Sequence, residues 1–257
     1  MSVDLERLAR RMLADFDART QDRLFAEPID LTSGRAYDLQ AEIARLREAR
    51  GERVVGYKLG CTSPAVQKQL GIDEPIIARL FDTERHDSGT RLLHASYANL
   101  AVEGELAVRL AADLPPTIPA GEECLEAIES IFPVIELHHY VLRSPKPCAH
   151  ELIASNGMHA GFVLAEGSSG GPRARVRNLT VALNDAIVGR SDAPWTMADP
   201  IASLRWLAAR LGRHGLRLTR GHVILTGSPL PLYPVGPGDR VVVEVPTLGI
   251  CRVSVDP

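Results

Sequence analysis

Short apolar segments separated by turn residues fill the chain from residue 76 onward, whereas the first 50 residues have helical character. Apolar side chains recur at helical spacing over residues 3–20 and 36–50, which predicts two amphipathic helices. The expected strands are residues 53–59, 76–81, 100–110, 132–137, 161–165, 176–183, 222–226, 240–245 and 250–255. A chain that places helices first and strands afterwards predicts an α+β fold rather than an alternating α/β fold.

Three further helices are predicted within the strand-rich part. Residues 63–71 begin with the N-cap candidate Ser63 and end at Gly71, residues 122–131 form a second helix, and residues 200–213 follow the N-cap candidate Asp199. We expect residues 1–75 to form a helical portion with the first strand. Residues 76–257 then form a β-rich body, and both parts belong to one continuous globular unit.

The composition excludes several classes of protein. With 29 basic and 32 acidic residues and no basic tract, the chain lacks the charge pattern of a nucleic-acid-binding protein. No apolar run is long enough to span a membrane, and the charged N-terminus is unlike a signal peptide. The four cysteines form no CxxC pair, which is typical of reduced thiols. We therefore expect a cytoplasmic protein without a nucleic-acid or membrane partner.

The segment LAVEGELAVRL, residues 100–110, carries Glu103 and Glu105 in an otherwise apolar run. Because side chains alternate across a strand, both carboxylates point to one face, about 7 Å apart along the backbone. Two like charges this close repel each other unless solvent or a cation lies between them. A solvated strand face is the simplest interpretation of such a pair.

A third glutamate, Glu136, interrupts the segment FPVIEL, which is apolar enough for a strand buried on both faces. An ionised carboxylate buried without a partner is very costly. Three carboxylates on predicted strands, with no evident Lys or Arg partner, match the oxygen ligands that Mg²⁺ prefers. On the residues alone, a solvated face and a shared divalent cation are both open interpretations.

Lys58 lies on the predicted strand 53–59, directly before the capped helix at residues 63–71. A lysine at a strand end commonly extends its ammonium group into solvent while its stem packs on apolar surface. The functional alternative is a partly buried ammonium group that holds a carboxylate or transfers a proton.

The segment GYKLGCTSPAVQKQLG, residues 56–71, resembles the signature of the 2-keto-4-pentenoate hydratase family. That family includes 2-oxohept-4-ene-1,7-dioate hydratases and 4-oxalocrotonate decarboxylases, within the fumarylacetoacetate hydrolase superfamily. The resemblance continues, in order, through Leu80-Phe-Asp82, Glu103-Gly-Glu105, Pro133-Val-Ile-Glu136, Leu183-Asn184, Asp199-Pro200 and the segment GHVILTG at residues 221–227.

The resemblance implies a mixed β-roll body of the fumarylacetoacetate hydrolase type, with an N-terminal helical portion, in a homo-oligomer. It implies that Glu103, Glu105 and Glu136 bind Mg²⁺ or Mn²⁺, and that Lys58 and Asp82 transfer protons. Without the resemblance, Asp82 reads as an ordinary turn residue at a strand end. The resemblance further implies substrate contacts at Leu59, Ser155, Asn156 and Thr226.

The implied reaction adds water to a 2-hydroxy-2,4-dienoate, through its 2-oxo-3-enoate tautomer, in the degradation of aromatic compounds. A divalent cation on the 2-oxo oxygen acts as a Lewis acid where negative charge develops, and the product is a 4-hydroxy-2-oxo acid. The same site suits a decarboxylase of 2-oxo-3-enedioates, which is the main alternative. An acylpyruvate C–C hydrolase, for which Glu84-Arg-His86 is a weak signal in an expected surface turn, and a non-catalytic binder of 2-oxo acids are further alternatives.

Two departures from the family pattern bear on the substrate. The chain reads Ser155-Asn-Gly-Met158 where the family usually has Asp-Asn-Ala-Ser, so Met158 lacks the serine hydroxyl that contacts substrate there. Cys61 stands where an aliphatic residue is common. The nearby histidines, His138, His139 and His159, are interpreted as structural residues, with recognition of a distal substrate group as the alternative.

Overall fold

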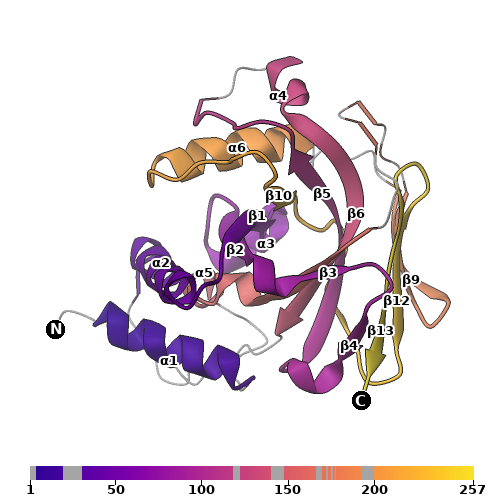
Figure 1. Cartoon of the computed structure of the whole chain (residues 1–257), viewed down its shortest axis with the longest axis horizontal. Helices are drawn as coiled ribbons and strands as arrows, with labels where there is room; N and C mark the ends of the chain where they lie inside the picture. Colours follow the sequence, from indigo (N-terminus) through magenta and orange to yellow (C-terminus); the bar gives the residue numbers. More distant parts are fainter. Residues whose placement is uncertain are drawn as a thin grey trace.

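The computed structural model describes residues 4–19, 31–117, 122–139, 148–165, 170–171, 173–174, 176, 178–192 and 200–257. Helices gather toward the N-terminal side, and strands form two sheets that lie beside each other (Figure 1). The α+β prediction with an N-terminal helical portion is therefore correct. The predicted N-cap Asp199 lies outside the described residues.

The two N-terminal helices are α1 (Leu5–Asp17) and α2 (Ser33–Ala49), close to the predicted ranges. Each begins where a side chain accepts a backbone N–H of the first turn, Asp4 in α1 and Thr32 in α2. Their apolar faces pack with a short helix, α5 (Ala149–Ala154), in one buried cluster. This cluster forms one wall of the region that holds the candidate site.

The larger sheet carries Lys58, Leu59 and the three glutamates on its strands. Its strands lie in the order β2-β1-β10-β5-β6-β7-β3, and β11 pairs with β5. These strands are β1 (Val54–Gly60), β2 (Ile76–Phe81), β3 (Arg85–Asp87), β5 (Leu100–Leu110), β6 (Ile128–His139), β7 (His159–Leu164), β10 (Val223–Leu225) and β11 (Tyr233–Pro234). The β1–β10 and β3–β7 pairs are parallel and the others antiparallel, so the sheet is mixed.

The smaller sheet packs on β5 and β6 and closes the core. Its order is β4-β13-β12-β8-β9, with β4 (Arg91–Leu93), β8 (Leu179–Leu183), β9 (Ala186–Ser191), β12 (Arg240–Val245) and β13 (Gly249–Asp256). Gly104 marks the close approach, because a Cβ atom there would lie 2.5 Å from Val181 Cγ2 and 3.0 Å from Val243 Cγ2. The glycine between the two glutamates thus lets side chains of the second sheet approach the strand.

The remaining elements are α3 (Pro64–Leu70), α4 (Glu122–Glu126), α6 (Pro200–Gly212) and the 3₁₀ turns η2 (Asp82–Glu84), η3 (His94–Ser96) and η4 (Asn156–Met158). The helix expected over residues 122–131 ends at Glu126, and β6 begins at Ile128. Strand pairing with β5 decides this boundary, since Ile128 and Ile131 are buried in the core shared by both sheets. The short helix α5 was not predicted from the sequence.

Candidate active site

The β5–β6 register brings the three glutamates into one region. Glu103 pairs directly with Glu136, and Glu105 lies two residues further along the same face of β5. Glu136 is fully buried, Glu105 is 1% exposed, and the side chain of Glu103 is 23% exposed. The interpretation of this face as solvated is therefore wrong, because the neighbouring elements cover it.

Lys58 reaches the carboxylates from β1. Its Nζ lies 2.7 Å from Glu136 Oε1 and donates a hydrogen bond of 3.0 Å to the carbonyl oxygen of Gly157. Burial opposes the charged amine, but the carboxylates of Glu136 and Glu103 outweigh that effect and raise the pKa of Lys58. Lys58 is only 3% exposed, so it does not extend into solvent, and it is a protonated group inside the site.

The carboxylate of Glu136 uses its two oxygens differently. Oε1 contacts both Lys58 Nζ and His159 Nδ1, each at 2.7 Å, whereas Oε2 has no hydrogen-bond partner among the described residues. Burial would raise the pKa of Glu136, but Lys58 and the neighbouring histidines outweigh it and lower the pKa. The site therefore contains an ionised, buried carboxylate with one unpartnered oxygen.

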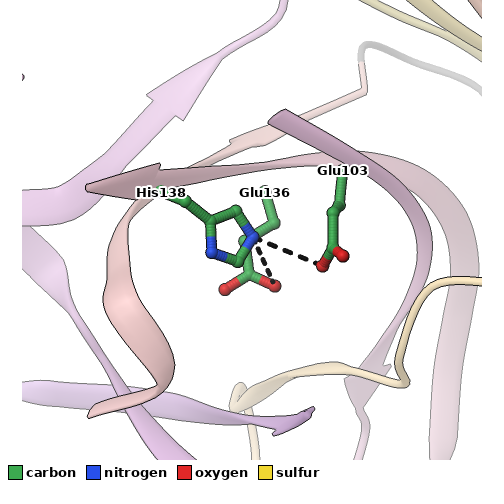
Figure 2. A group of neighbouring side chains, drawn as sticks. All are labelled: Glu103, Glu136 and His138. Atoms are coloured by element: carbon green, nitrogen blue, oxygen red, sulfur yellow. Dashed lines mark ion pairs between the residues drawn. The ribbon is translucent and has the colours of Figure 1, made fainter. Parts of the chain in front are cut away.

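His138 lies beside these carboxylates, on the same face of β6 as Glu136 (Figure 2). Its Nε2 lies 3.3 Å from Glu103 Oε2 and 3.6 Å from Glu136 Oε2. The residue is 2% exposed, and neither ring nitrogen has a hydrogen-bond partner in the described part of the chain. The interpretation of His138 as a satisfied structural residue is therefore wrong. Its position two residues after Glu136 on a strand was the signal for a shared face.

Glu105 is held at the other end of the cluster. Its Oε2 accepts a 3.0 Å hydrogen bond from the backbone N–H of Gly227, just after β10. Burial raises the pKa of Glu105 well above its ordinary value, and the charges of Glu136 and Glu103 add to the shift. Thr226, next to Gly227, is fully buried and donates its hydroxyl to the carbonyl oxygen of Leu106 at 3.0 Å.

These groups fit a divalent cation. Within the described residues, Glu103, Glu136 and His138 each offer one ligand atom, and these atoms lie within 4.8 Å of one another. Glu136 offers a carboxylate oxygen and His138 an imidazole nitrogen without hydrogen-bond partners, and the mutual repulsion of the carboxylates contributes to the raised pKa of Glu105. A bound cation would remove each of these penalties.

Two other predicted site residues make no hydrogen bond or ion pair with the glutamates among the described residues. The Asp82 carboxylate accepts hydrogen bonds of 2.9 Å from the backbone N–H and the Nε of Arg53, and these hold its pKa below the ordinary value. None of the hydrogen bonds and ion pairs of Asp82 in the described chain involves the three glutamates. Leu59 is 2% exposed and packs in the main apolar core.

Ser155 and Asn156 lie at the turn η4, next to Lys58. Ser155 Oγ donates to the carbonyl oxygen of Leu152, and the Asn156 amide pairs with the backbone N–H and C=O of Arg79, each at 2.8 Å. Both side chains are therefore engaged with the protein and position the turn. Gly157 follows with φ of +64°, and a Cβ atom there would lie 2.6 Å from Lys58 Cε.

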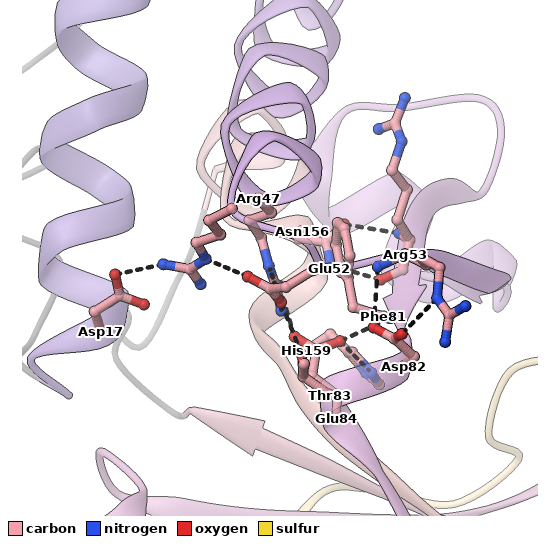
Figure 3. A network of polar contacts seen from close by, with 12 residues as sticks. Asp17, Arg47, Glu52, Arg53, Phe81, Asp82, Thr83, Glu84, Asn156 and His159 are labelled. Carbon is pink, nitrogen blue, oxygen red and sulfur yellow. Dashed lines mark hydrogen bonds and ion pairs between the residues drawn. The ribbon is translucent and has the colours of Figure 1, made fainter.

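A buried polar network lies behind His159 (Figure 3). His159 Nε2 is 3.6 Å from Glu84 Oε2, and Glu84 Oε1 accepts a hydrogen bond of 2.6 Å from Arg47 Nη1. Arg47 also pairs with Glu52, and its guanidinium lies 3.7 Å from the centre of the Phe81 ring. Glu84 is thus 5% exposed inside the fold, and the expectation that it lies in a surface turn is wrong.

A small cavity adjoins the cluster on the side of α1. Its volume is about 70 Å³, and His159 forms part of its wall. The exposed wall surface is mainly apolar and comes from side chains of α1, α2, α5 and η4, including Met12, Leu13, Phe16, Ile43, Ala154 and Met158. Polar and charged residues, namely Asp15, Arg19, Arg47, His139, Ser155 and Asn156, complete the lining. Met158 adopts φ of +58°, a conformation that non-glycine residues seldom take. The backbone of η4 therefore directs an apolar side chain to this wall.

Comparisons with known proteins agree with this architecture. Residues 84–256 match the family described as fumarylacetoacetate (FAA) hydrolase, C-terminal. The chain is 30% identical to the 2-hydroxyhexa-2,4-dienoate hydratase of Comamonas testosteroni, covering 92% of this chain and 91% of that protein. It is 31% identical to the 2-keto-4-pentenoate hydratase of Burkholderia vietnamiensis, covering 85% and 84%.

A solved structure shares the whole fold. The 4-oxalocrotonate decarboxylase from Pseudomonas putida G7, complexed with magnesium and adipate, superposes with a TM-score of 0.85 at 25% identity, covering 98% of this chain and 97% of that chain. In the described residues, no helix is long and apolar enough to cross a membrane. The predicted β-roll architecture and the resemblance read from the sequence motifs are thus confirmed, and the chain belongs to the fumarylacetoacetate hydrolase family.

Proposed function

We propose that the protein is a divalent-metal-dependent hydratase that adds water to a 2-hydroxy-2,4-dienoate through its 2-oxo-3-enoate tautomer. The observation that carries the proposal is the state of Glu136. Lys58 and His159 hold its Oε1, while Oε2, Glu103 and His138 face one another without hydrogen-bond partners for Oε2 and the imidazole. This arrangement supports the binding of a cation that chelates a 2-oxo acid. The similarity to two proteins named hydratases supports hydration as the reaction.

The bound cation would supply Lewis acidity at the substrate oxygen on which negative charge develops during hydration. Lys58 acts beside it as a positively charged donor, because its pKa is raised and it carries its proton at neutral pH. We assign to Lys58 the donation of a proton toward C5 of the dienol. Its contacts with Glu136 and Gly157 fix the ammonium group for that transfer.

Asp82 retains the proton-transfer role that the family resemblance implies, and that role is part of the proposal. Its carboxylate is ionised and held by Arg53 at the end of β2. Asp82 begins the turn η2, and Glu84 at the end of the same turn lies 3.6 Å from His159, which contacts Glu136. The turn that carries Asp82 thus reaches the residues around Glu136, which supports the proposed role. Glu105 stays with Glu103 and Glu136 in the proposed metal site.

The cavity favours hydration of a monoacid over decarboxylation of a dioate. Its walls are mainly apolar, and the charge of Arg47 is already neutralised by two buried glutamates. Asp15 lines the cavity together with Arg19, so the local charges are balanced. A second carboxylate would be poorly solvated there. At about 70 Å³ the cavity is about half the size of one that holds benzene, which suits a short aliphatic tail.

A substrate panel tests the proposal. Purified protein with Mg²⁺ or Mn²⁺ is mixed with 2-hydroxypenta-2,4-dienoate, with its C5-methyl homologue and with a 2-hydroxy-2,4-dienedioate, and the loss of dienol absorbance is followed. We expect turnover of the two monoacids that disappears with EDTA and in Lys58→Met. Release of carbon dioxide from the dienedioate as the main reaction would establish the decarboxylase instead. Metal binding without turnover of any of these compounds, or of an acylpyruvate, would establish a non-catalytic binder.

Assembly into a homo-oligomer is also part of the proposal. On the edge strand β9, Ile187 is 59% exposed and Val188 is 41% exposed. An edge strand with exposed branched apolar side chains is a common site for association with another chain. Light scattering after size-exclusion chromatography should give a mass larger than one chain, and Ile187→Lys should reduce it. A monomer at micromolar concentration would contradict this part of the proposal.

A further inference from the structure

The environment of His138 is unusual for a buried histidine. The residue is 2% exposed, and both of its ring nitrogens lack hydrogen-bond partners among the described residues. A neutral imidazole has one donor and one acceptor, and burial without partners is unfavourable for each. By contrast, the adjacent His139 accepts a 3.1 Å hydrogen bond from the backbone N–H of Ala98. The fold therefore satisfies one of two neighbouring histidines and leaves the other unsatisfied.

The free edge of the His138 ring points into the carboxylates. Its Nε2 lies 3.3 Å from Glu103 Oε2 and 3.6 Å from Glu136 Oε2 (Figure 2). A charge-assisted hydrogen bond is about 2.7–2.9 Å long, so neither contact is a well-formed one. Two ligands of one cation, each at about 2.1 Å and at right angles, are about 3 Å apart. Both contacts of the imidazole nitrogen are therefore close to the spacing expected between ligands of one shared ion.

We propose that His138 is a nitrogen ligand of the catalytic cation, in addition to the carboxylates of the proposed metal site. This inference rests on the proposed metal-dependent function and extends it to the identity of the metal. Mg²⁺ loses its hydration water reluctantly and takes oxygen ligands, so a nitrogen ligand disfavours it more than it disfavours a first-row transition ion such as Mn²⁺. The site therefore binds Mn²⁺ in preference to Mg²⁺.

Glu105 has a different place in this arrangement. Its Oε2 is already bonded to the Gly227 backbone N–H, and its carboxylate oxygens lie outside the group of atoms within 4.8 Å of one another. In the metal site expected from the family resemblance, Glu105 is the third carboxylate ligand, and the proposed function keeps it there. His138 is therefore an additional ligand, which that resemblance does not imply.

The test is pulsed electron paramagnetic resonance of the Mn²⁺-loaded protein, which detects the ¹⁴N nucleus of a coordinated imidazole directly. We expect a ¹⁴N modulation in the wild-type protein that is lost in His138→Gln. His159→Gln is the matched control, because His159 also contacts Glu136 but its Nδ1 is engaged with Oε1, and the modulation should persist. Labelling the wild-type protein with [¹⁵N]histidine should replace the ¹⁴N signal, which provides a readout that does not depend on any variant folding.

Calorimetry gives the second readout. We expect wild-type protein to bind Mn²⁺ at least about 10-fold more tightly than Mg²⁺, and His138→Gln to reduce this ratio toward 1. Mn²⁺ binding without ¹⁴N modulation, or modulation that survives His138→Gln, would overturn the inference while leaving the hydratase proposal intact. Modulation that depends on His138 in a protein without turnover would support the inference and refute the hydratase. Failure to bind either ion would refute both.

Discussion

The contact between Gly157 and Lys58 offers a sharp test of the site. Gly157 has φ of +64°, and an added Cβ would lie 2.6 Å from Lys58 Cε and 3.0 Å from Lys58 Nζ. Gly71, the C-cap of α3, is a matched control, with φ of +68° and no atom within 4 Å of the added Cβ. The two glycine-to-alanine substitutions therefore share the backbone penalty and differ only in the contact with Lys58.

The expected magnitudes follow from these contacts. An alanine in the left-handed region costs about 1–2 kcal/mol, which is the whole effect expected for Gly71→Ala. The end of a lysine side chain can swing aside, but here it would lose its buried hydrogen bond to Gly157, worth about 1.5–3 kcal/mol for a charged donor. Gly157→Ala should therefore lower the free energy of unfolding by about 2.5–5 kcal/mol.

Urea unfolding of the metal-free protein measures the difference, and a common slope for all variants would show that only stability has changed. At about 2–4 °C per kcal/mol, the additional loss in Gly157→Ala should lower the Tm by a further 3–12 °C, approximately, relative to Gly71→Ala. In a Lys58→Ala background, Gly157→Ala should cost only the backbone penalty. Equal losses in the two single variants would refute the placement of the Lys58 ammonium against this turn.

Three other perturbations test the groups around the cluster. Asp82→Asn should lower kcat by about 100-fold or more if Asp82 transfers a proton. Arg53→Ala breaks the same exposed ion pair and should leave kcat within a few-fold of the wild-type value. Similar small effects in both variants would exclude proton transfer by Asp82. Glu105→Gln should stabilise the metal-free protein, because burial and like charge raise the folded-state pKa of Glu105 above its unfolded value. This gain in stability should grow as the pH rises above about 4.5 and vanish below it. Thermal unfolding at pH 5 and at pH 8 checks the sign. Arg47→Met should cost about 3–5 kcal/mol in urea unfolding, since it removes a buried guanidinium from both Glu52 and Glu84. Arg91→Met at a surface pair should cost under about 1 kcal/mol. Comparable losses would mean that the buried network does not stabilise the fold.

The periodicity of the sequence was sufficient for the main features of the fold. Apolar spacing located α1, α2 and most strands, because helical and strand periods are properties of local sequence. Alternation on β5 placed Glu103 and Glu105 on one face, and the apolar surroundings of Glu136 indicated burial. The predicted end of the helix at residue 131 was wrong, because the pairing of β6 with β5 outweighs the local preference for helix.

The partners of the polar side chains were beyond the reach of the sequence. Lys58 meets Glu136 and Gly157, which are 78 and 99 positions away along the chain. Nothing in the local pattern says that Asp82 pairs with Arg53, or that Asn156 binds the backbone of β2. Alternation assigns a side chain to a face, but its partner depends on which strands become neighbours.

The sequence by itself determined an α+β chain with carboxylates on buried strands, because burial and periodicity are written in the order of apolar residues. Only the tertiary structure decided how those carboxylates are used. Packing of β1, β5, β6 and β7 satisfies one oxygen of Glu136 with Lys58 and His159, and leaves the other oxygen and His138 without partners. Hydrogen-bond satisfaction is a property of the assembled fold, and it is what distinguishes a candidate metal site from three buried charges.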